Sequence, residues 1–318
     1  MPRHAHYVPH GVIPAVILPF SENLDIDENG FRKHLRDIAA VEGLSAVTVN
    51  AHSTEVASCT FDEQRRVLAI ARDEIGGKLP IVNGIWADGS LEAARIAGMA
   101  EEGGASALLV FPPAPFTLGQ SPAMAVEHFR RIADASSLPL IVFQYPLATG
   151  QGYPRETLIK MCEEVPTIRA IKDWSGNVAQ HEMHVRELQT RKPAVNVLST
   201  HSAWLLSSLV LGCNGLLSGS GSVIADLQST LFHAVKANDL AAARRVNDRI
   251  YPLARVFYAD PWADMHNRMK EALVLLGRLP RAVVRPPLVK ISRAEIDRIR
   301  SALVDAGLLT QKAARDAA

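Results

Sequence analysis

The sequence has few cysteines, no long apolar run and almost no net charge, and each shortage excludes a class of protein. Its three cysteines, Cys59, Cys162 and Cys213, are scattered through 318 residues without a CxxC pair. This favours free thiols in a reducing cytoplasm over a disulfide framework or a zinc site. No run reaches the roughly 18 apolar residues of a membrane span, and the first eleven residues lack the apolar centre of a signal peptide. We therefore expect a cytoplasmic protein that does not enter a membrane.

The charges are balanced, with 34 lysines and arginines against 33 aspartates and glutamates. A nearly neutral chain has no electrostatic reason to bind nucleic acid or an anionic membrane. Apolar residues make up 48% of the chain, which is enough for a sizeable core. The expected partner is therefore a small molecule.

Eight short apolar runs, each followed by a segment with helical signals, predict the fold. The runs are continuously apolar, as in parallel strands covered on both faces, and their spacing of about 30 residues indicates helical crossovers. An α/β fold of the (β/α)8 TIM-barrel type accounts for this pattern. The alternative, a doubly wound dinucleotide fold, needs a GxGxxG motif after the first strand, which residues 14–19 do not provide. The predicted strands are residues 12–18, 46–49, 80–85, 107–111, 140–143, 169–172, 195–198 and 215–218.

The barrel is expected to occupy residues 1–224, and residues 225–318 are expected to form C-terminal helices packed on it. Periodic apolar positions in residues 240–259 and 262–276 predict two of these helices. A serine cap followed by acidic residues predicts a third over residues 292–306.

The sixth run ends in "IRAIKDWSG", and active sites of such barrels lie at the carboxyl ends of the strands. Side chains alternate along a strand, so Lys172 points into the barrel if Ile171 faces the helices. Loss of hydration there favours the neutral amine, which can attack a ketone and form a Schiff base. The alternative is a lysine that reaches solvent or pairs with Asp173.

The fifth run continues into "FQYP", with Ile141, Phe143 and Tyr145 on the face argued for Lys172. Tyr145 would then place a phenol at the barrel mouth, where it can shuttle a proton to a carbinolamine intermediate. A purely structural aromatic residue is the alternative.

Two loops and one histidine pair complete the candidates. After the second run, Ser53 and its neighbours in "AHSTE" can offer hydroxyl and backbone N–H donors to a carboxylate, or simply form a polar loop. The "SGSGSV" after the eighth run is either an anion cradle or a tight turn. His181 and His184 are three residues apart, whereas HExxH requires four, so we expect a solvated helix face and no metal site.

In their order and spacing, these segments resemble the dihydrodipicolinate synthase and N-acetylneuraminate lyase family of class I pyruvate-type aldolases. The resemblance extends from about residue 11 to residue 309. It rests on "GVIPAVILPF", "AHSTE", "GASALLVFPP", "FQYP", "AIKDWSG" and "RPPLVKIS".

The resemblance implies that Lys172 is the Schiff-base lysine and that no cofactor is needed, because the lysine supplies the electron sink. It assigns the carboxylate of an α-keto acid to Ser53 and the His52 backbone. Leu217 falls where the family contacts pyruvate, and Thr200 and His201 fall where some members contact the distal part of the substrate. A homotetramer, built as a dimer of dimers, is also implied.

The departures from the family pattern concern proton transfer. The family's relay tyrosine falls on Phe143, its first hydroxyl residue on His52, and its aromatic pair on Ala114-Pro115. The arginine that the synthases use for the carboxylate of the aldehyde substrate falls on Ala148. We therefore expect a protein other than a true dihydrodipicolinate synthase, and "YPLATG" is similar to the sugar-acid aldolase branch.

Two hypotheses follow from the sequence. In the first, the protein is a lyase, an aldolase or a dehydratase, for a hydroxylated 2-keto(-3-deoxy) acid, with Phe143 lining the substrate site. Lys172, Tyr145 and His52 are its catalytic set, and His52 titrates near neutrality. In the second, the barrel binds keto acids without turnover. The absence of an obvious arginine suggests a hydroxylated or aromatic tail on the substrate.

Overall fold

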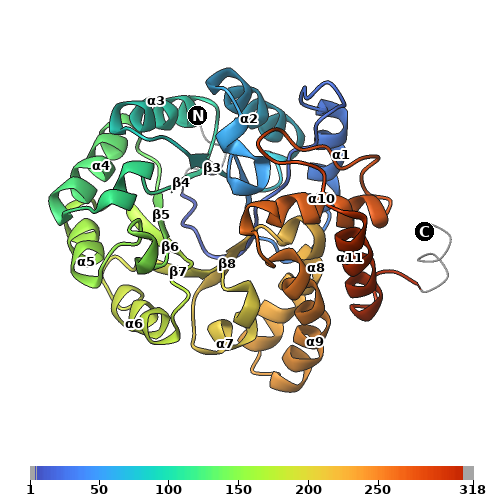
Figure 1. The fold of residues 1–318 in the computed structure, drawn as a ribbon. Coiled ribbons are helices and arrows are strands. Elements are labelled where there is room, and N and C mark those ends of the chain that lie inside the picture. The colour runs from blue at the N-terminus through green and yellow to red at the C-terminus, as the bar shows by residue number, and fades with distance from the viewer. Residues whose placement is uncertain (1–3, 5, 311–318) are drawn as a thin grey trace.

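The computed structural model describes residue 4 and residues 6–310. Residues 11–236 form a barrel of parallel strands surrounded by helices (Figure 1). Hydrogen bonds join the strands in the order β1-β8-β7-β6-β5-β4-β3-β2. A parallel bridge between Ala15 and Thr48 brings β1 beside β2 and closes the ring. The predicted TIM barrel is confirmed. The strands are β1 Gly11–Pro14, β2 Val47–Val49, β3 Ile81–Ile85, β4 Ala107–Val110, β5 Leu140–Gln144, β6 Ile168–Asp173, β7 Asn196–Ser199 and β8 Gly215–Ser218.

The helices of the outer ring begin at the signals seen in the sequence. The Thr60 side chain accepts a hydrogen bond from the Glu63 backbone, and the Glu63 side chain accepts one from the Thr60 backbone, which forms the capping box that starts α2. Short 3-10 helices lie in the loops at the carboxyl ends of β2, β4, β5 and β7. The helices of the ring are α1 Glu28–Ala39, α2 Phe61–Ile75, α3 Ser90–Glu102, α4 Pro122–Ala135, α5 Arg155–Glu164, α6 Val178–Leu188, α7 Leu205–Val210 and α8 Gly221–Lys236.

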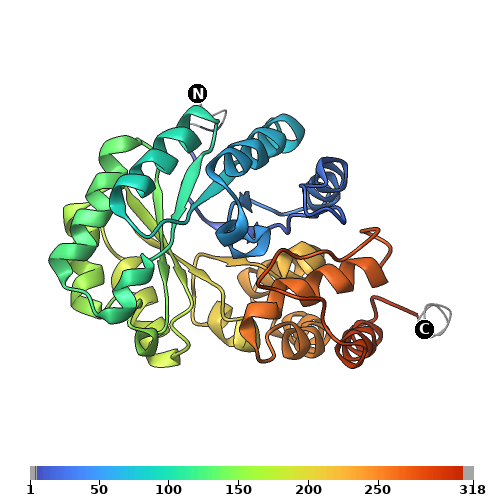
Figure 2. The same ribbon diagram turned by 45° about the horizontal axis from the view of Figure 1, so that its top comes forward.

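The three predicted C-terminal helices are α9 Leu240–Phe257, α10 Met265–Leu275 and α11 Arg293–Asp305. They pack against one another beside α8 and form the orange and red group in Figure 2. The predicted domain boundary after residue 224 falls within α8 and stays a prediction. Among the described residues, no helix is both long and apolar enough to cross a membrane.

Two apolar layers form the core, because successive side chains of a strand point to opposite sides. The outer layer lies between strands and helices. The inner layer fills the barrel and includes Ile141, Phe143, Tyr145 and Ala170. The predicted inward face of β5 is therefore confirmed, and it leads directly to the carboxyl end of the barrel.

Candidate active site

Lys172 lies near the end of β6 and is only 5% exposed. In the sheet it is paired with Phe143 of β5, and its Nζ lies 4.0 Å from the centre of the Phe143 ring. Burial lowers the pKa of Lys172 to about 7. A large fraction of the amine is therefore neutral, and nucleophilic, at neutral pH.

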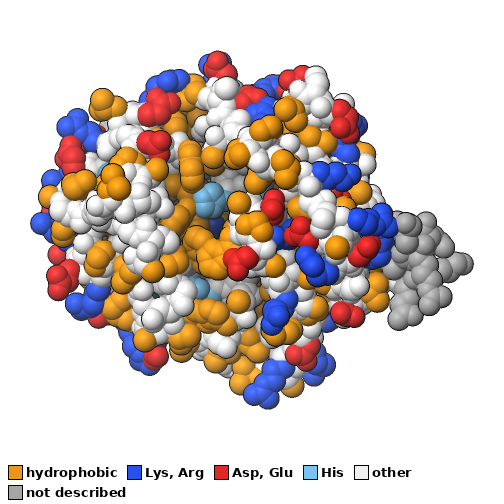
Figure 3. Space-filling view, viewed as in Figure 1, with side chains coloured by type: hydrophobic (Ala, Val, Ile, Leu, Met, Phe, Trp, Pro, Cys, Tyr) orange, Lys and Arg blue, Asp and Glu red, His pale blue; other side chains and the backbone are white. Residues whose placement is uncertain are grey.

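The lysine faces a pocket at the barrel mouth, which we call the lysine pocket. In the space-filling view, this face has a central hollow with hydrophobic side chains around it and histidine inside it (Figure 3). Strand ends and their loops supply most of the wall, and the C-terminal region closes one side. The lining residues are Ala15, Ala51, His52, Ser53, Phe143, Lys172, Trp174, Thr200, Gly219, Tyr258, Met265 and His266.

His52 and Tyr145 are hydrogen-bonded to each other, with 3.0 Å between His52 Nε2 and Tyr145 Oη. Burial and the charge of Lys172 lower the pKa of His52 to about 3, and burial raises the pKa of Tyr145 above its usual value. The expectation that His52 titrates near neutrality is therefore wrong, because its surroundings disfavour the imidazolium ion. The structure places a neutral imidazole against a neutral phenol.

Ser53 lies in the 3-10 helix His52–Thr54 that follows β2. Its hydroxyl oxygen is buried in the wall of the lysine pocket without a hydrogen-bond partner. A buried hydroxyl without a partner is costly unless a ligand or water satisfies it. This geometry is consistent with the role predicted for Ser53 toward a carboxylate, which stays a prediction.

Of the three residues predicted to contact the rest of the substrate, one lines the lysine pocket and two do not. Thr200, after β7, lines the lysine pocket. Leu217 of β8 is fully buried in the inner apolar layer and is not part of the pocket lining. His201 is buried too, but its Nε2 lies 3.5 Å from the Asp173 carboxylate and its ring stacks on Trp204. The structure therefore does not bring His201 to the substrate pocket.

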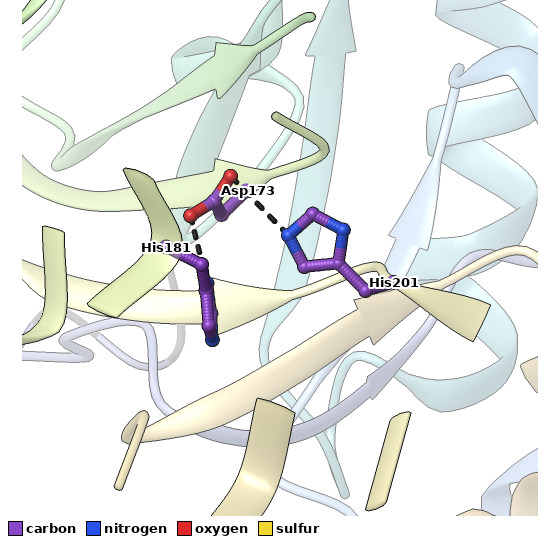
Figure 4. A group of neighbouring side chains, drawn as sticks. All are labelled: Asp173, His181 and His201. Atoms are coloured by element: carbon purple, nitrogen blue, oxygen red, sulfur yellow. Dashed lines mark hydrogen bonds and ion pairs between the residues drawn. The ribbon is translucent and has the colours of Figure 1, made fainter. Parts of the chain in front are cut away.

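Asp173, the residue after the lysine, faces the helix layer and is fully buried (Figure 4). Its Oδ2 accepts hydrogen bonds of 2.8 Å from Nδ1 of both His181 and His184. Burial raises the pKa of Asp173, but the hydrogen bonds from His181 and His184, with the nearby His201 ring, outweigh it and hold that pKa well below its usual value. Burial lowers the pKa of His181, but Asp173 and Cys213 outweigh it and raise that pKa to about 9.

The prediction of a solvated face for His181 and His184 is therefore wrong, since both are buried around one carboxylate. Asp173, His181 and His201 have the donor atoms of a metal site, all within 4.8 Å of one another. However, the second ring nitrogen of His181 is hydrogen-bonded to Ser208 Oγ at 2.8 Å. The 2.8 Å separations from Asp173 are those of charge-assisted hydrogen bonds. Hydrogen bonds therefore account for the contacts of His181 and His184 with Asp173, while Nε2 of His184 and Nε2 of His201 have no hydrogen-bond partner among the described residues.

Sequence reasoning missed the contribution of the C-terminal region. His266 of α10 is buried in the pocket wall, and burial, with positive charge nearby, keeps its pKa well below the usual value. Gly219 makes room for it, because a Cβ there would lie 2.7 Å from His266 Nε2. Trp174 and Met265 also line the pocket. The sequence offers no local signal for His266 and Met265, since their contacts depend on how α10 docks on the barrel. Trp174 directly follows β6, two residues after Lys172, so the alternation along that strand could have indicated it.

The residues that follow β2 are fixed by a buried ion pair to α10. Lys270 Nζ donates to the Glu55 carboxylate, and both side chains are at most 5% exposed. Glu55 also accepts a 3.0 Å hydrogen bond from the Arg285 backbone. The loop that carries His52 and Ser53 is thus attached to the C-terminal region.

Known proteins resemble this chain over nearly its whole length, including the barrel and the C-terminal helices. Residues 8–306 match the family model of the dihydrodipicolinate synthetase family. The 4-hydroxy-tetrahydrodipicolinate synthase of Chloroherpeton thalassium is 28% identical over 304 residues, which cover 95% of this chain and 97% of that protein. The synthase of Methanopyrus kandleri is 29% identical over 303 residues, again covering 95% and 97%.

Two solved structures have the same architecture. A dihydrodipicolinate synthase from Cyanidioschyzon merolae with lysine bound has a TM-score of 0.85 at 26% identity, covering 94% of this chain and 99% of that one. YagE of E. coli K12, a prophage protein in complex with pyruvate, has a TM-score of 0.87 at 22% identity, with coverage of 94% and 99%. With its family match over nearly all described residues, the chain belongs to the dihydrodipicolinate synthetase family, whose members are lyases.

Proposed function

We propose that the protein is a lyase in which Lys172 forms a Schiff base with an α-keto acid. The observation that carries the proposal is the buried Lys172 amine at the lysine pocket, with its pKa lowered to about 7. The neutral Nζ attacks the C2 carbonyl and gives a carbinolamine, which loses water as the C=N bond forms. The buried Ser53 hydroxyl, which has no partner, is the proposed donor to the keto-acid carboxylate.

The proposed substrate is a hydroxylated 2-keto-3-deoxy acid. In the cleavage (retro-aldol) direction, the C3–C4 bond breaks, its electron pair passes to the imine as an enamine, and the C4 hydroxyl loses its proton to give an aldehyde. Protonation at C3 and hydrolysis then release pyruvate. Dehydration begins from the same Schiff base and differs in the bond that breaks.

The hydrogen-bonded Tyr145 and His52 are the proposed proton relay in place of the tyrosine missing at position 143. A hydroxyl can accept a proton from one neighbour while it donates its own to another. Tyr145 can therefore pass a proton between two groups of the bound substrate without becoming a tyrosinate, which its raised pKa disfavours. His52, whose lowered pKa disfavours the imidazolium ion, holds the Tyr145 hydroxyl in place through the 3.0 Å hydrogen bond.

Dihydrodipicolinate synthesis is not the proposed reaction. Phe143 carries no hydroxyl, and Ala148, which falls where the resemblance expects an arginine, is an exposed residue of the 3-10 helix Leu147–Thr149. Within the described part of the chain, Lys172 is the one lysine or arginine in the lining of the lysine pocket. A second substrate carboxylate would find no cation there. The homotetramer and the cytoplasmic location stay predictions from the sequence.

Reductive trapping tests the proposal. The protein is incubated with pyruvate and borohydride, digested, and analysed by mass spectrometry, with Lys172→Met as the control. We expect a reduced pyruvate adduct on Lys172 and none on the variant. The absence of an adduct on Lys172 across a panel of α-keto acids would contradict the Schiff base. An adduct without pyruvate release from any 4-hydroxy-2-keto acid would instead favour the keto-acid-binding alternative.

A further inference from the structure

Aromatic rings form a continuous wall around Lys172. The His52 ring lies 5.3 Å from that of Trp86 and 4.7 Å from that of Phe111, centre to centre. The centre of the Tyr145 ring, just after β5, lies 5.3 Å from the centre of the Trp174 ring, just after β6. Aromatic groups prefer edge-to-face or offset contacts at such separations. Of these rings, those of His52 and Trp174 line the lysine pocket together with that of Phe143, so the pocket offers flat surfaces that suit another ring.

The wall continues outward into a second cavity, which shares His52, Met265 and His266 with the lysine pocket. The Trp262 ring lies 5.2 Å from that of Trp174, so the aromatic surface is continuous between the two spaces. We call this space, which holds about 950 Å³, the outer cavity. It is lined by His52, Glu55, Val56, Ala57, Ser58, Trp262, Ala263, Met265, His266, Arg285, Pro286, Pro287 and Leu288.

The two charged residues of the outer cavity are already paired. The Glu55 carboxylate is held by Lys270 and by the Arg285 backbone N–H. The Arg285 guanidinium donates to the Glu63 carboxylate and to the backbone carbonyls of Leu24 and Ser58. These bonds engage all three of its nitrogen atoms, so it has little capacity left for a ligand carboxylate.

The two shared histidines are also uncharged. Burial and nearby positive charge lower the pKa of His52 to about 3 and keep that of His266 well below its usual value. The route from Lys172 outward therefore contains the hydroxyls of Ser53, Thr200 and Tyr258 at its inner end, and beyond them mainly apolar surface and neutral imidazoles. It suits neither an anionic tail nor a chain of hydroxyl groups, which would leave most of its hydrogen bonds unmade.

We infer that the substrate of Lys172 carries an aromatic group on C4, which lies between the lysine pocket and the outer cavity against Trp174 and Trp262. The inference rests on the proposed function and narrows its substrate to 4-aryl-4-hydroxy-2-oxobutanoates. Breaking the C3–C4 bond of such an acid yields an aryl aldehyde and, after C3 is protonated and the imine hydrolysed, pyruvate. No further reactant is required besides the water of the hydrolysis.

Three 4-hydroxy-2-keto acids that differ in the C4 substituent test the inference: a phenyl group, a carboxylate, and a short polyol. Release of pyruvate is measured for each with the full chain. We expect kcat/KM for the phenyl compound to exceed the other two by about tenfold or more, the scale on which apolar pockets discriminate. A polyol or carboxylate compound that reacts as well as the phenyl compound would overturn the inference, as would turnover of none of them.

Trapping of pyruvate in the same preparation separates the two proposals. If no adduct forms, the Schiff base itself is wrong. If an adduct forms but the substrate order is reversed, only the aromatic tail is wrong.

Two substitutions that each remove one aromatic ring test whether the aromatic group of the substrate contacts Trp262. Trp262 is 47% exposed, so Trp262→Ala should fold and should raise KM for the phenyl substrate by about tenfold. Tyr251→Ala is the matched control, because Tyr251 is a similarly exposed ring on α9 outside both cavities. Equal KM values for the two variants would place the tail elsewhere and overturn the inference.

Discussion

Phe143 and Lys172 are paired across β5 and β6, and the lysine Nζ lies over the face of the phenylalanine ring at 4.0 Å from its centre. Two opposing effects meet at this point. Burial favours the neutral amine, whereas the negative face of an aromatic ring attracts the ammonium ion. Phe143, which stands where the resemblance expects a tyrosine, therefore acts directly on the protonation of Lys172, the proposed nucleophile.

Phe143→Leu should lower the pKa of Lys172 further below about 7. The ring interaction stabilises the charged form by about 1 to 2 kcal/mol in a desolvated site, which corresponds to roughly one pKa unit. The pKa is measured from the pH dependence of the trapping rate with pyruvate. Phe111→Leu is the control, since Phe111 contacts Phe143 but is not the ring over the amine. A rise in the pKa would show that the ring acts only by excluding water.

Lys172→Met should stabilise the protein below about pH 7. The folded pKa of about 7 lies below the ordinary value of 10.5, so at low pH the folded state carries the full cost of a buried ammonium. That cost is about 3 to 5 kcal/mol, at about 1.4 kcal/mol per pKa unit. It declines as the pH rises from 7 to 10.5, because the folded lysine is then neutral and the unfolded lysine gains less free energy from binding its proton with each pH unit.

Urea unfolding at several pH values measures this difference. The gain of the methionine variant should shrink steadily above pH 7. The exposed Lys160 provides the control Lys160→Met, which should show no such trend. A constant difference at all pH values would contradict the lowered pKa.

Tyr145→Phe should reduce kcat by about 10²- to 10⁴-fold, the usual contribution of a positioned acid or base. The variant removes the hydroxyl that meets His52 but keeps the ring contacts of Tyr145 with Phe143 and Trp174. Adduct formation with pyruvate, followed by mass spectrometry, should still reach completion, though more slowly. An unchanged kcat would exclude Tyr145 from the relay.

Lys270→Met should destabilise the protein by about 3 to 5 kcal/mol, because it leaves the Glu55 carboxylate buried without its cation. The double variant Glu55→Gln/Lys270→Met should recover most of that loss in urea unfolding. Lys33→Met breaks an exposed pair with Asp37 and should cost less than about 1 kcal/mol. Equal losses in the single and double variants would argue that packing of Lys270, rather than its charge, is what matters.

The fold and the inward orientation of Lys172 could be predicted because they depend on local patterns. Continuous apolar runs indicate strands covered on both faces, and alternation along a strand places Phe143, Tyr145 and Lys172 on the inner side. The hydrogen bond from Tyr145 to His52 joins two such strand ends, so both residues could be named from the sequence.

The remainder of the site depends on contacts between distant segments. Glu55 and Lys270 are 215 positions apart, and His266 reaches the pocket only because α10 docks on the barrel. For His181 and His184, the spacing shows that they share one side of a helix, but not whether that side meets water or Asp173. For His201, after β7, the sequence likewise does not show which way the side chain points. In the structure it points toward the Asp173 carboxylate and does not line the lysine pocket.

The cluster of Asp173, His181, His184 and His201 has a consequence for the lysine beside it. An aspartate facing into the lysine pocket would attract a proton to the amine and remove its reactivity. Here the carboxylate is held by imidazoles on the opposite side of β6. A transplant of Lys172 into another barrel would therefore have to include the histidines of α6 and of the loop after β7, because the transplanted unit is larger than the lining of the lysine pocket.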